Sequence, residues 1–209
     1  EQFGLAASDH CNKSTVYRGR HINETVGQQA KLDPKRWVIL IHPGAHLPAA
    51  YRDIIQTIDN PILLLGPHPW PETPKMIAAI DPVHEHDRDQ YSDKQIIRQA
   101  KTLRRALHAE LSSVHSCYVP PYLIKYKNSI TDTHQEAFDN FIADNTLLGY
   151  QHRLLQGSPD TTLPQHVKNQ QGNILLVGSV ARGYLARKLI GSTTDRMLRN
   201  ARVPHLILR

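Results

Sequence analysis

Residues 173–198 read NILLVGSVARGYLARKLIGSTTDRML and join an apolar run to a segment rich in glycine and hydroxyl side chains. The apolar run stops at Gly178, and the sequence GSTT at 191–194 stands just before a helical pattern. Backbone N–H groups and hydroxyls at the start of a helix attract anions, and glycine lets a phosphate approach the backbone. Glycine after a strand and serine or threonine before a helix are also common for structural reasons. This stretch alone therefore predicts either a phosphate site or a structural turn.

Short apolar runs recur along the chain and alternate with helical patterns. The runs are aliphatic with little alternation, which is typical of strands covered on both faces. An apolar stripe at three- and four-residue steps runs from Ile96 to Leu111, and a shorter stripe covers residues 137–142. Strands separated by helices predict an α/β fold with an open parallel sheet and helices on both faces. The predicted strands are 37–41, 62–65, 75–80, 114–119, 152–156, 173–177 and 205–208.

Three ordered matches indicate an internal repeat. The matches pair VILIHPGA (38–45) with ILLVGSVA (174–181), NPILLLG (60–66) with VPHLILR (203–209), and residues 16–29 with 154–167, at offsets of 136, 143 and 138 residues. The offset grows from 136 to 143 residues between the first and second of these matches. The first copy therefore lacks seven residues in the part that corresponds to residues 182–202, which carry Gly191-Ser192. His42 stands where the second copy has Gly178. Ligand binding is therefore predicted for the second copy alone.

The repeat predicts two unequal domains. Residues 1–66 correspond to the back half of a degenerate domain, and residues 75–209 to a complete one. The connector at 67–74 is rich in proline, which opposes both helix and central strand. Half an α/β domain leaves a sheet edge and apolar faces uncovered. We therefore expect that a further half domain precedes Glu1 or that another chain covers these surfaces.

Composition disfavours several classes of protein. The net charge is +6, but lysine and arginine are scattered along the chain, which favours a solvated surface over a nucleic-acid site. The longest apolar runs are far too short to span a bilayer. Cys11 and Cys117 show no metal-binding spacing, so we expect reduced thiols in a cytoplasmic protein, with Cys117 packed in the core.

Known catalytic and metal motifs are not found in the sequence. The glycine segment is neither a Walker A loop nor GxGxxG, and the chain has no GxSxG elbow. The run His84-Glu85-His86-Asp87 follows a predicted strand in a polar loop, where we expect solvated side chains rather than metal ligands. None of the thirteen histidines stands at a recognisable nucleophile–base spacing. The sequence thus favours a protein that is not primarily an enzyme.

Beyond these motifs, one spacing resembles that of a known family. Gly178-x-x-Ala181, nine residues and then Gly191-Ser192 is similar to the nucleotide signature of the universal stress protein family, with Ala181 where the family has glycine. Other segments that resemble the family are KMIAAIDP (75–82), its first strand ending in aspartate; LLQGSP (154–159), its strand–glycine turn; and VPHLILR (203–209), its last strand. The connector PWPE and the repeat are similar to tandem-domain members. The resemblance covers 75–209 and, more loosely, 14–66.

The resemblance implies a five-stranded parallel domain with strand order 3-2-1-4-5 and, as in some members, a site for ATP or a related adenine nucleotide. It places the aspartate that contacts adenine and ribose at Asp81, and a backbone adenine contact at Val119. It implies no metal site. The phosphate and ribose contacts fall in the signature itself, at Gly178, Ala181, Gly191, Ser192, Thr193 and Thr194.

These observations lead to a functional expectation with two alternatives. We expect a stress-response protein whose second domain binds ATP as a conformational or interaction switch, with at most slow, incidental hydrolysis. Its partners would be a second copy or its own degenerate domain. The first alternative is an interaction module that binds no nucleotide and dimerises through its C-terminal strand, whose edge would expose unpaired backbone groups. The second is an adenine-nucleotide-dependent enzyme of related architecture.

Overall fold

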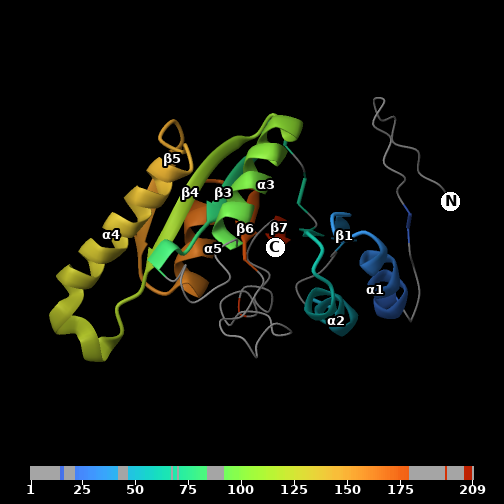
Figure 1. Cartoon of the computed structure of the whole chain (residues 1–209), viewed down its shortest axis with the longest axis horizontal. Coiled ribbons are helices and arrows are strands. Elements are labelled where there is room, and N and C mark those ends of the chain that lie inside the picture. Colours follow the sequence, from blue (N-terminus) through green and yellow to red (C-terminus); the bar gives the residue numbers. More distant parts are fainter. Residues whose placement is uncertain are drawn as a thin grey trace.

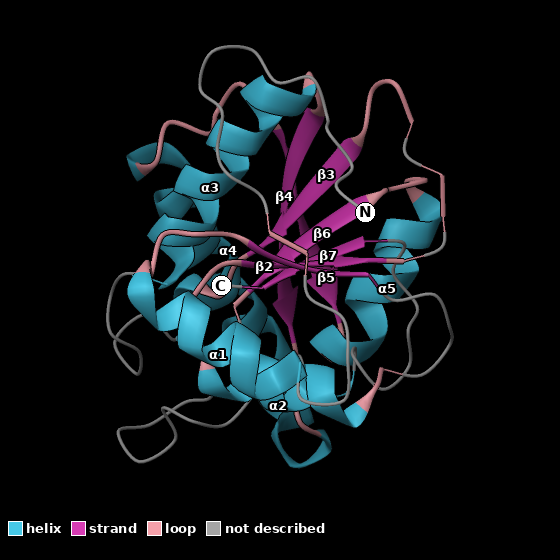
Figure 2. Cartoon of the chain, turned by 90° about the vertical axis from the view of Figure 1, so that its right-hand side faces the viewer, coloured by secondary structure: helices cyan, strands magenta, loops and turns pink. Residues whose placement is uncertain are grey.

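The computed structural model describes residues 15–16, 22–41, 47–66, 68–69, 71–83, 92–178, 196 and 205–208. In these residues the strands form one sheet in the order β1-β2-β7-β6-β3-β4-β5. Helices lie along both faces of this sheet (Figure 1, Figure 2). The α/β class and the largely parallel sheet predicted from the sequence are confirmed. None of the described helices has both the length and the apolar character that a bilayer crossing requires.

Each apolar run that predicted a strand forms one. The strands are β1 (Val38–Ile41), β2 (Ile62–Leu65), β3 (Lys75–Ala79), β4 (Glu110–Cys117), β5 (Gln151–Gln156), β6 (Ile174–Val177) and β7 (His205–Leu208). The range 114–119 predicted for β4 is wrong at both ends. The preceding helix ends at Leu107 because His108 takes a positive φ of 50°, so Leu111 belongs to the strand rather than to the helical stripe.

The helices connect the strands as the alternating pattern predicts. They are α1 (Ile22–Leu32), α2 (Ala49–Thr57), α3 (Ser92–Leu107), the 3₁₀ helix η2 (Pro121–Tyr126), α4 (Lys127–Asp144) and α5 (Pro159–Asn169). Gly157 makes the turn between β5 and α5 with a φ of 125°, a conformation that L side chains rarely adopt. Its N–H donates to the carbonyl oxygen of Cys117 at 2.8 Å, which ties this turn to the end of β4.

The sheet is parallel except at one joint. β2 and β7 pair antiparallel, with Ile62 opposite Leu208 and Leu65 opposite His205. β6 pairs in parallel with the other side of β7. The C-terminal strand therefore offers no free edge to the partner strand that the dimerisation hypothesis requires, because β2 of the same chain lies there. The outer strands of the described sheet are β1 and β5.

Two apolar clusters cover the two faces of the sheet. One contains buried residues of α1, α2 and α5, such as Val26, Ile54 and Leu163, together with Leu175 and Val177 of β6. The other contains Ile96 of α3, Phe138 of α4 and Leu176 of β6. α3 and α5 accordingly lie on opposite sides of the strands (Figure 2). Residues from both sides of the proline-rich connector share the first cluster, and the predicted division at this connector stays a prediction.

The structure shifts the alignment of the internal repeat by one residue. An offset of 136 pairs Leu40 with Leu176, but these side chains face opposite sides of the sheet, since they belong to different clusters. An offset of 137 pairs Leu40 with Val177, which lie in the same cluster. The same offset pairs the buried residues of α1 and α5, Val26 with Leu163 and Ala30 with Val167. Side chains alternate across a strand, so a slip of one residue exchanges the two faces.

Candidate functional site

The chain order of the strands creates a topological switch point between β3 and β6, the place where open parallel sheets have a crevice for ligands. From β3 the chain moves outward to β4 and β5, then returns to β6 on the other side of β3. In open parallel sheets, ligands bind outside the carboxyl ends of the strands at such a switch point. Asp81 follows β3 and Gly178 follows β6, so both predicted site residues flank the crevice. Val119 follows β4 at the same edge of the sheet.

Other predicted residues cannot be placed. Ala181, Gly191, Ser192, Thr193 and Thr194 lie outside the described residues, as do Cys11 and the run from His84 to Asp87. Elsewhere in the part that the structure describes, no three His, Cys, Asp or Glu side chains gather as a metal site would require.

Asp81 is held by its neighbours on two elements. Its backbone N–H donates to Oδ2 of Asp93 at 3.0 Å, and Asp93 lies buried in the first turn of α3. The Asp81 side chain is 21% exposed, and its Oδ1 lies 3.9 Å from Nδ1 of His115 on β4. A half-buried carboxylate at this place accepts hydrogen bonds from sugar hydroxyls or an amino group.

A pair of buried histidines supports this end of the crevice. His115 Nδ1 lies 3.0 Å from the carbonyl oxygen of Ile80, which only accepts, so this nitrogen carries a hydrogen and donates it. His115 Nε2 lies 2.7 Å from Nδ1 of His134 on α4, and the two rings stack with centroids 4.9 Å apart. In the neutral pair, His134 Nδ1–H therefore donates to His115 Nε2. The pair fixes the backbone immediately before Asp81.

Asp93, His115 and His134 are the residues that sequence reasoning missed near this crevice. His115 gave no distinctive signal, because Glu110 and three serines are also polar residues of β4, and its burial to 1% exposure is visible only in the structure. His134 on α4 contacts His115, and Asp93 on α3 contacts the backbone of Asp81. Contacts between different elements of this kind cannot be read from spacing along the chain.

Within residues 179–198 the structure describes Arg196, which contacts α5. Arg196 Nη1 donates to Oδ2 of Asp160 at 3.2 Å, in the first turn of α5. A hydrogen bond from Ser158 and, more weakly, the contact with Arg196 lower the pKa of Asp160, although burial opposes this. Arg196 thus contacts the same end of the sheet as the crevice, because α5 begins where β5 ends.

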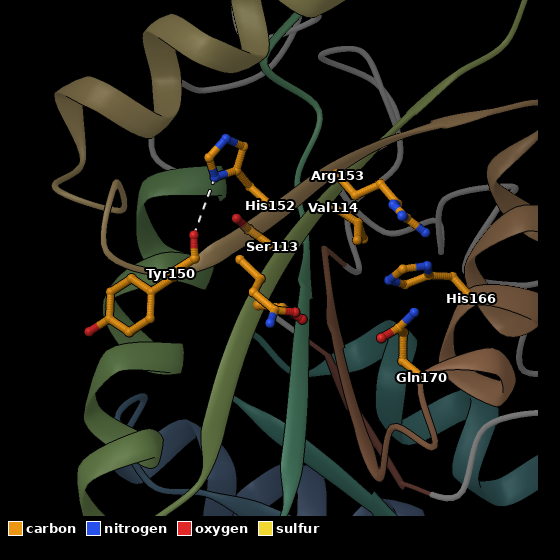
Figure 3. A pocket seen from close by; sticks show the side chains of 9 residues that line it. Ser113, Val114, Tyr150, His152, Arg153, His166 and Gln170 are labelled. Carbon is orange, nitrogen blue, oxygen red and sulfur yellow. Dashed lines mark hydrogen bonds between the residues drawn. The ribbon is translucent and has the colours of Figure 1, made fainter.

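A pocket lies between β5 and α5, away from the switch point (Figure 3). Its volume is about 410 Å³. It is lined by Ser112, Ser113, Val114, Tyr150, Gln151, His152, Arg153, His166 and Gln170. These residues lie in the first half of β4, at the start of β5 and at the end of α5, so the pocket is near the amino ends of the strands. Sequence reasoning did not find it.

Three further side chains have surroundings that favour structural roles. Cys117 is 1% exposed, which confirms its place in the core, and burial raises the pKa of its thiol. Arg104 lies over the ring of Tyr150, with 5.3 Å from the guanidinium carbon to the ring centroid. Tyr122 of η2 is 79% exposed, so it contributes little to any core.

The fold and the crevice define an α/β protein with a largely parallel, doubly wound sheet. The family model of the universal stress protein family matches residues 77–209, and the chain belongs to this family. Universal stress protein E of Salmonella typhi is 19% identical over 167 residues, which is 75% of this chain and 53% of the relative. The chain thus spans about half the length of the curated relatives it matches.

Solved structures agree on the fold. A universal-stress-type protein from Pseudomonas aeruginosa UCBPP-PA14 has a TM-score of 0.76 at 19% identity, covering 91% of this chain and 68% of that one. A universal stress protein from Archaeoglobus fulgidus DSM 4304 has a TM-score of 0.59 at 12% identity, covering 89% of this chain and 64% of that one. At these identities the likeness concerns the fold alone.

Proposed function

We propose that the chain is a stress-response protein that binds an adenine nucleotide such as ATP in the crevice between β3 and β6. The observation that carries this proposal is the position of Asp81 and Gly178 at the ends of two adjacent parallel strands, on either side of the switch point. The carboxylate of Asp81 accepts hydrogen bonds from the ribose or the adenine amino group. Gly178 leaves room for the ligand beside the strand end.

The phosphates are assigned to the signature segment that the family resemblance implies. Gly191, Ser192, Thr193 and Thr194 supply backbone N–H groups and hydroxyls, which suit an anion at the start of a helix. Ala181 adds a Cβ where the family has glycine, so this position sets how closely the phosphates approach. The bound nucleotide acts as a switch, because binding favours whichever conformation of the crevice it fits best. Hydrolysis is slow and incidental in this proposal.

Thermal unfolding with and without ATP tests the proposal. We expect ATP to stabilise the wild-type chain, by about 2.7 kcal/mol when free ATP is 100 times its dissociation constant. Asp81→Asn keeps the size of the side chain but removes its charge, so it should weaken this effect. The double variant Gly191→Asp with Ser192→Asp should abolish it, because two carboxylates would repel the phosphates. Asp132→Asn, an exposed change on α4, is the matched control.

The absence of ATP-dependent stabilisation in the wild-type chain would contradict the proposal. Mass spectrometry of small molecules released from the denatured protein then distinguishes an empty crevice from one that holds another ligand. The alternative of an interaction module would need a surface other than the edge of β7, which β2 covers. A phosphate-release assay at saturating ATP tests the alternative of an enzyme.

A further inference from the structure

The pocket between β5 and α5 lies away from the proposed nucleotide crevice. Its lining residues are at the amino ends of the strands, whereas Asp81 and Gly178 follow the carboxyl ends. Its volume of about 410 Å³ falls in the range of small-molecule sites. A ligand here would be independent of a nucleotide bound in the crevice.

The side chains that line this pocket are mostly polar, and none of them is a carboxylate. The lining set includes an arginine, two histidines, two glutamines and two serines, and neither aspartate nor glutamate. Arg153 projects from β5 and makes no ion pair with any residue that the structure describes. A positive charge that faces a polar pocket without an acidic partner favours an anionic ligand.

His166 of α5 is, like Ser113 of β4, a buried polar member of this set. Its side chain is 9% exposed, and within the described part of the chain its ring makes no hydrogen bond. Burial and, to a smaller extent, the charge of Arg153 lower the pKa of His166. Figure 3 shows Arg153, His166 and Gln170 directed toward one another from β5 and α5. A ligand between them would meet a guanidinium, a ring N–H and an amide N–H.

We propose that this pocket binds a small organic phosphate, with its phosphate group between Arg153, His166 and Gln170. A tetrahedral phosphate has acceptor oxygens in several directions, which suits donors that come from two elements. The volume exceeds that of the anion and leaves room for an organic group. The N-terminal repeat carries Gln29 and Asp33 at the positions equivalent to His166 and Gln170, so an acidic side chain replaces a donor there.

A titration of the full chain with phenyl phosphate, followed by ¹⁵N–¹H NMR, tests the site. We expect saturable shifts at Arg153, His166 and Gln170, and a rise in the pKa of His166, since a bound anion favours the imidazolium. Arg153→Gln should weaken binding on the order of tenfold or more, through the loss of a charge-assisted hydrogen bond. Arg98→Gln removes the same charge from an exposed position on α3 and should leave the affinity unchanged.

Three other outcomes of the titration would overturn the proposed phosphate site. Shifts confined to the surroundings of Asp81 and Gly178 would mean that phenyl phosphate enters the crevice instead. Equal weakening by Arg153→Gln and Arg98→Gln would indicate attraction to the overall charge of the protein. Equally tight binding of benzoate would overturn the assignment to phosphate. Because Arg153 is exposed, its substitution should preserve the native spectrum, so a loss of shifts reports on binding.

Discussion

β1 and β6 have closely similar apolar sequences but different surroundings. On the face covered by α1, α2 and α5, Leu40 of β1 is 3% exposed and its equivalent, Val177 of β6, is 4% exposed. On the opposite face, Ile39 is 56% exposed whereas its equivalent, Leu176, is 1% exposed. Leu176 belongs to the cluster that includes residues of α3 and α4, whereas Ile39 is exposed.

This difference shows which part of the architecture creates the crevice. β6 lies between β7 and β3, whereas β1 pairs only with β2 among the described strands. The apolar run and the preceding helix suffice to form a strand in both places. A switch point, however, requires a neighbour such as β3, which is followed by Asp81. The two strands therefore differ in their neighbours, and only β6 lies beside a switch point among the described strands.

The largest expected effect on stability comes from truncating equivalent side chains on the face of the sheet opposite α1, α2 and α5, which is covered at β6 but exposed at β1. Leu176→Ala should lower the free energy of unfolding by about 3 kcal/mol, because it leaves a cavity in a closed cluster. Ile39→Ala should lower it by less than about 1 kcal/mol, because water already reaches the side chain. Urea unfolding of both variants measures these values. Similar losses at the two positions would show that the face of β1 is covered in solution.

Buried Asn60 and half-buried Asn173 are expected to differ less in their contribution to stability. Asn60 Nδ2 donates to the carbonyl oxygens of Asp33 and Arg36, at 2.8 and 3.0 Å, within the N-terminal repeat. Asn173 Oδ1 accepts from the N–H of Lys75 at 2.9 Å and so links β6 to β3. We expect Asn60→Ala to cost about 2 kcal/mol and Asn173→Ala about 1 kcal/mol, since the first removes two hydrogen bonds and the second one. The reverse order in urea unfolding would refute this ranking.

His166 should give the smallest effect, visible as a pH dependence. Its pKa is lowered in the folded chain from a usual value of 6.5, so the unfolded chain binds a proton more readily. The stabilisation is complete above about pH 6.5 and is lost as the pH falls toward the folded pKa. His166→Gln, which introduces the residue found at Gln29, should make stability fall less between neutral and mildly acidic pH. Identical pH profiles for the variant and wild type would contradict this.

Much of the fold follows from local sequence. The apolar runs locate the strands, and the alternation with helices gives the parallel sheet. The alignment of the repeat could not be fixed to one residue, because VILI and ILLV match well at two offsets and only the two faces distinguish them. The end of α3 at Leu107 depends on the positive φ of a single residue, His108, so the helical stripe predicted from the sequence, which reached Leu111, is too long.

The candidate site residues differ in the same way in how far the sequence could predict them. Gly178 could be predicted because it directly follows a strand, whereas Asp81 was predicted from the resemblance to the universal stress protein family; the sheet brings the ends of these adjacent strands together. His115 and His134 meet only when α4 packs on β4, and Arg153 and His166 only when α5 folds back along β5. Such contacts depend on tertiary packing, and no spacing along the chain reports them.

Amide hydrogen exchange with and without ATP tests the central claim most directly, namely that the crevice beside β6 binds nucleotide and the end of β1 does not. The account predicts slower exchange at Asp81, Val83 and Gly178 when ATP is bound, with no change at residues 38–41 of the equivalent strand. Unchanged exchange at Asp81 and Gly178, or equal slowing at β1, would contradict it.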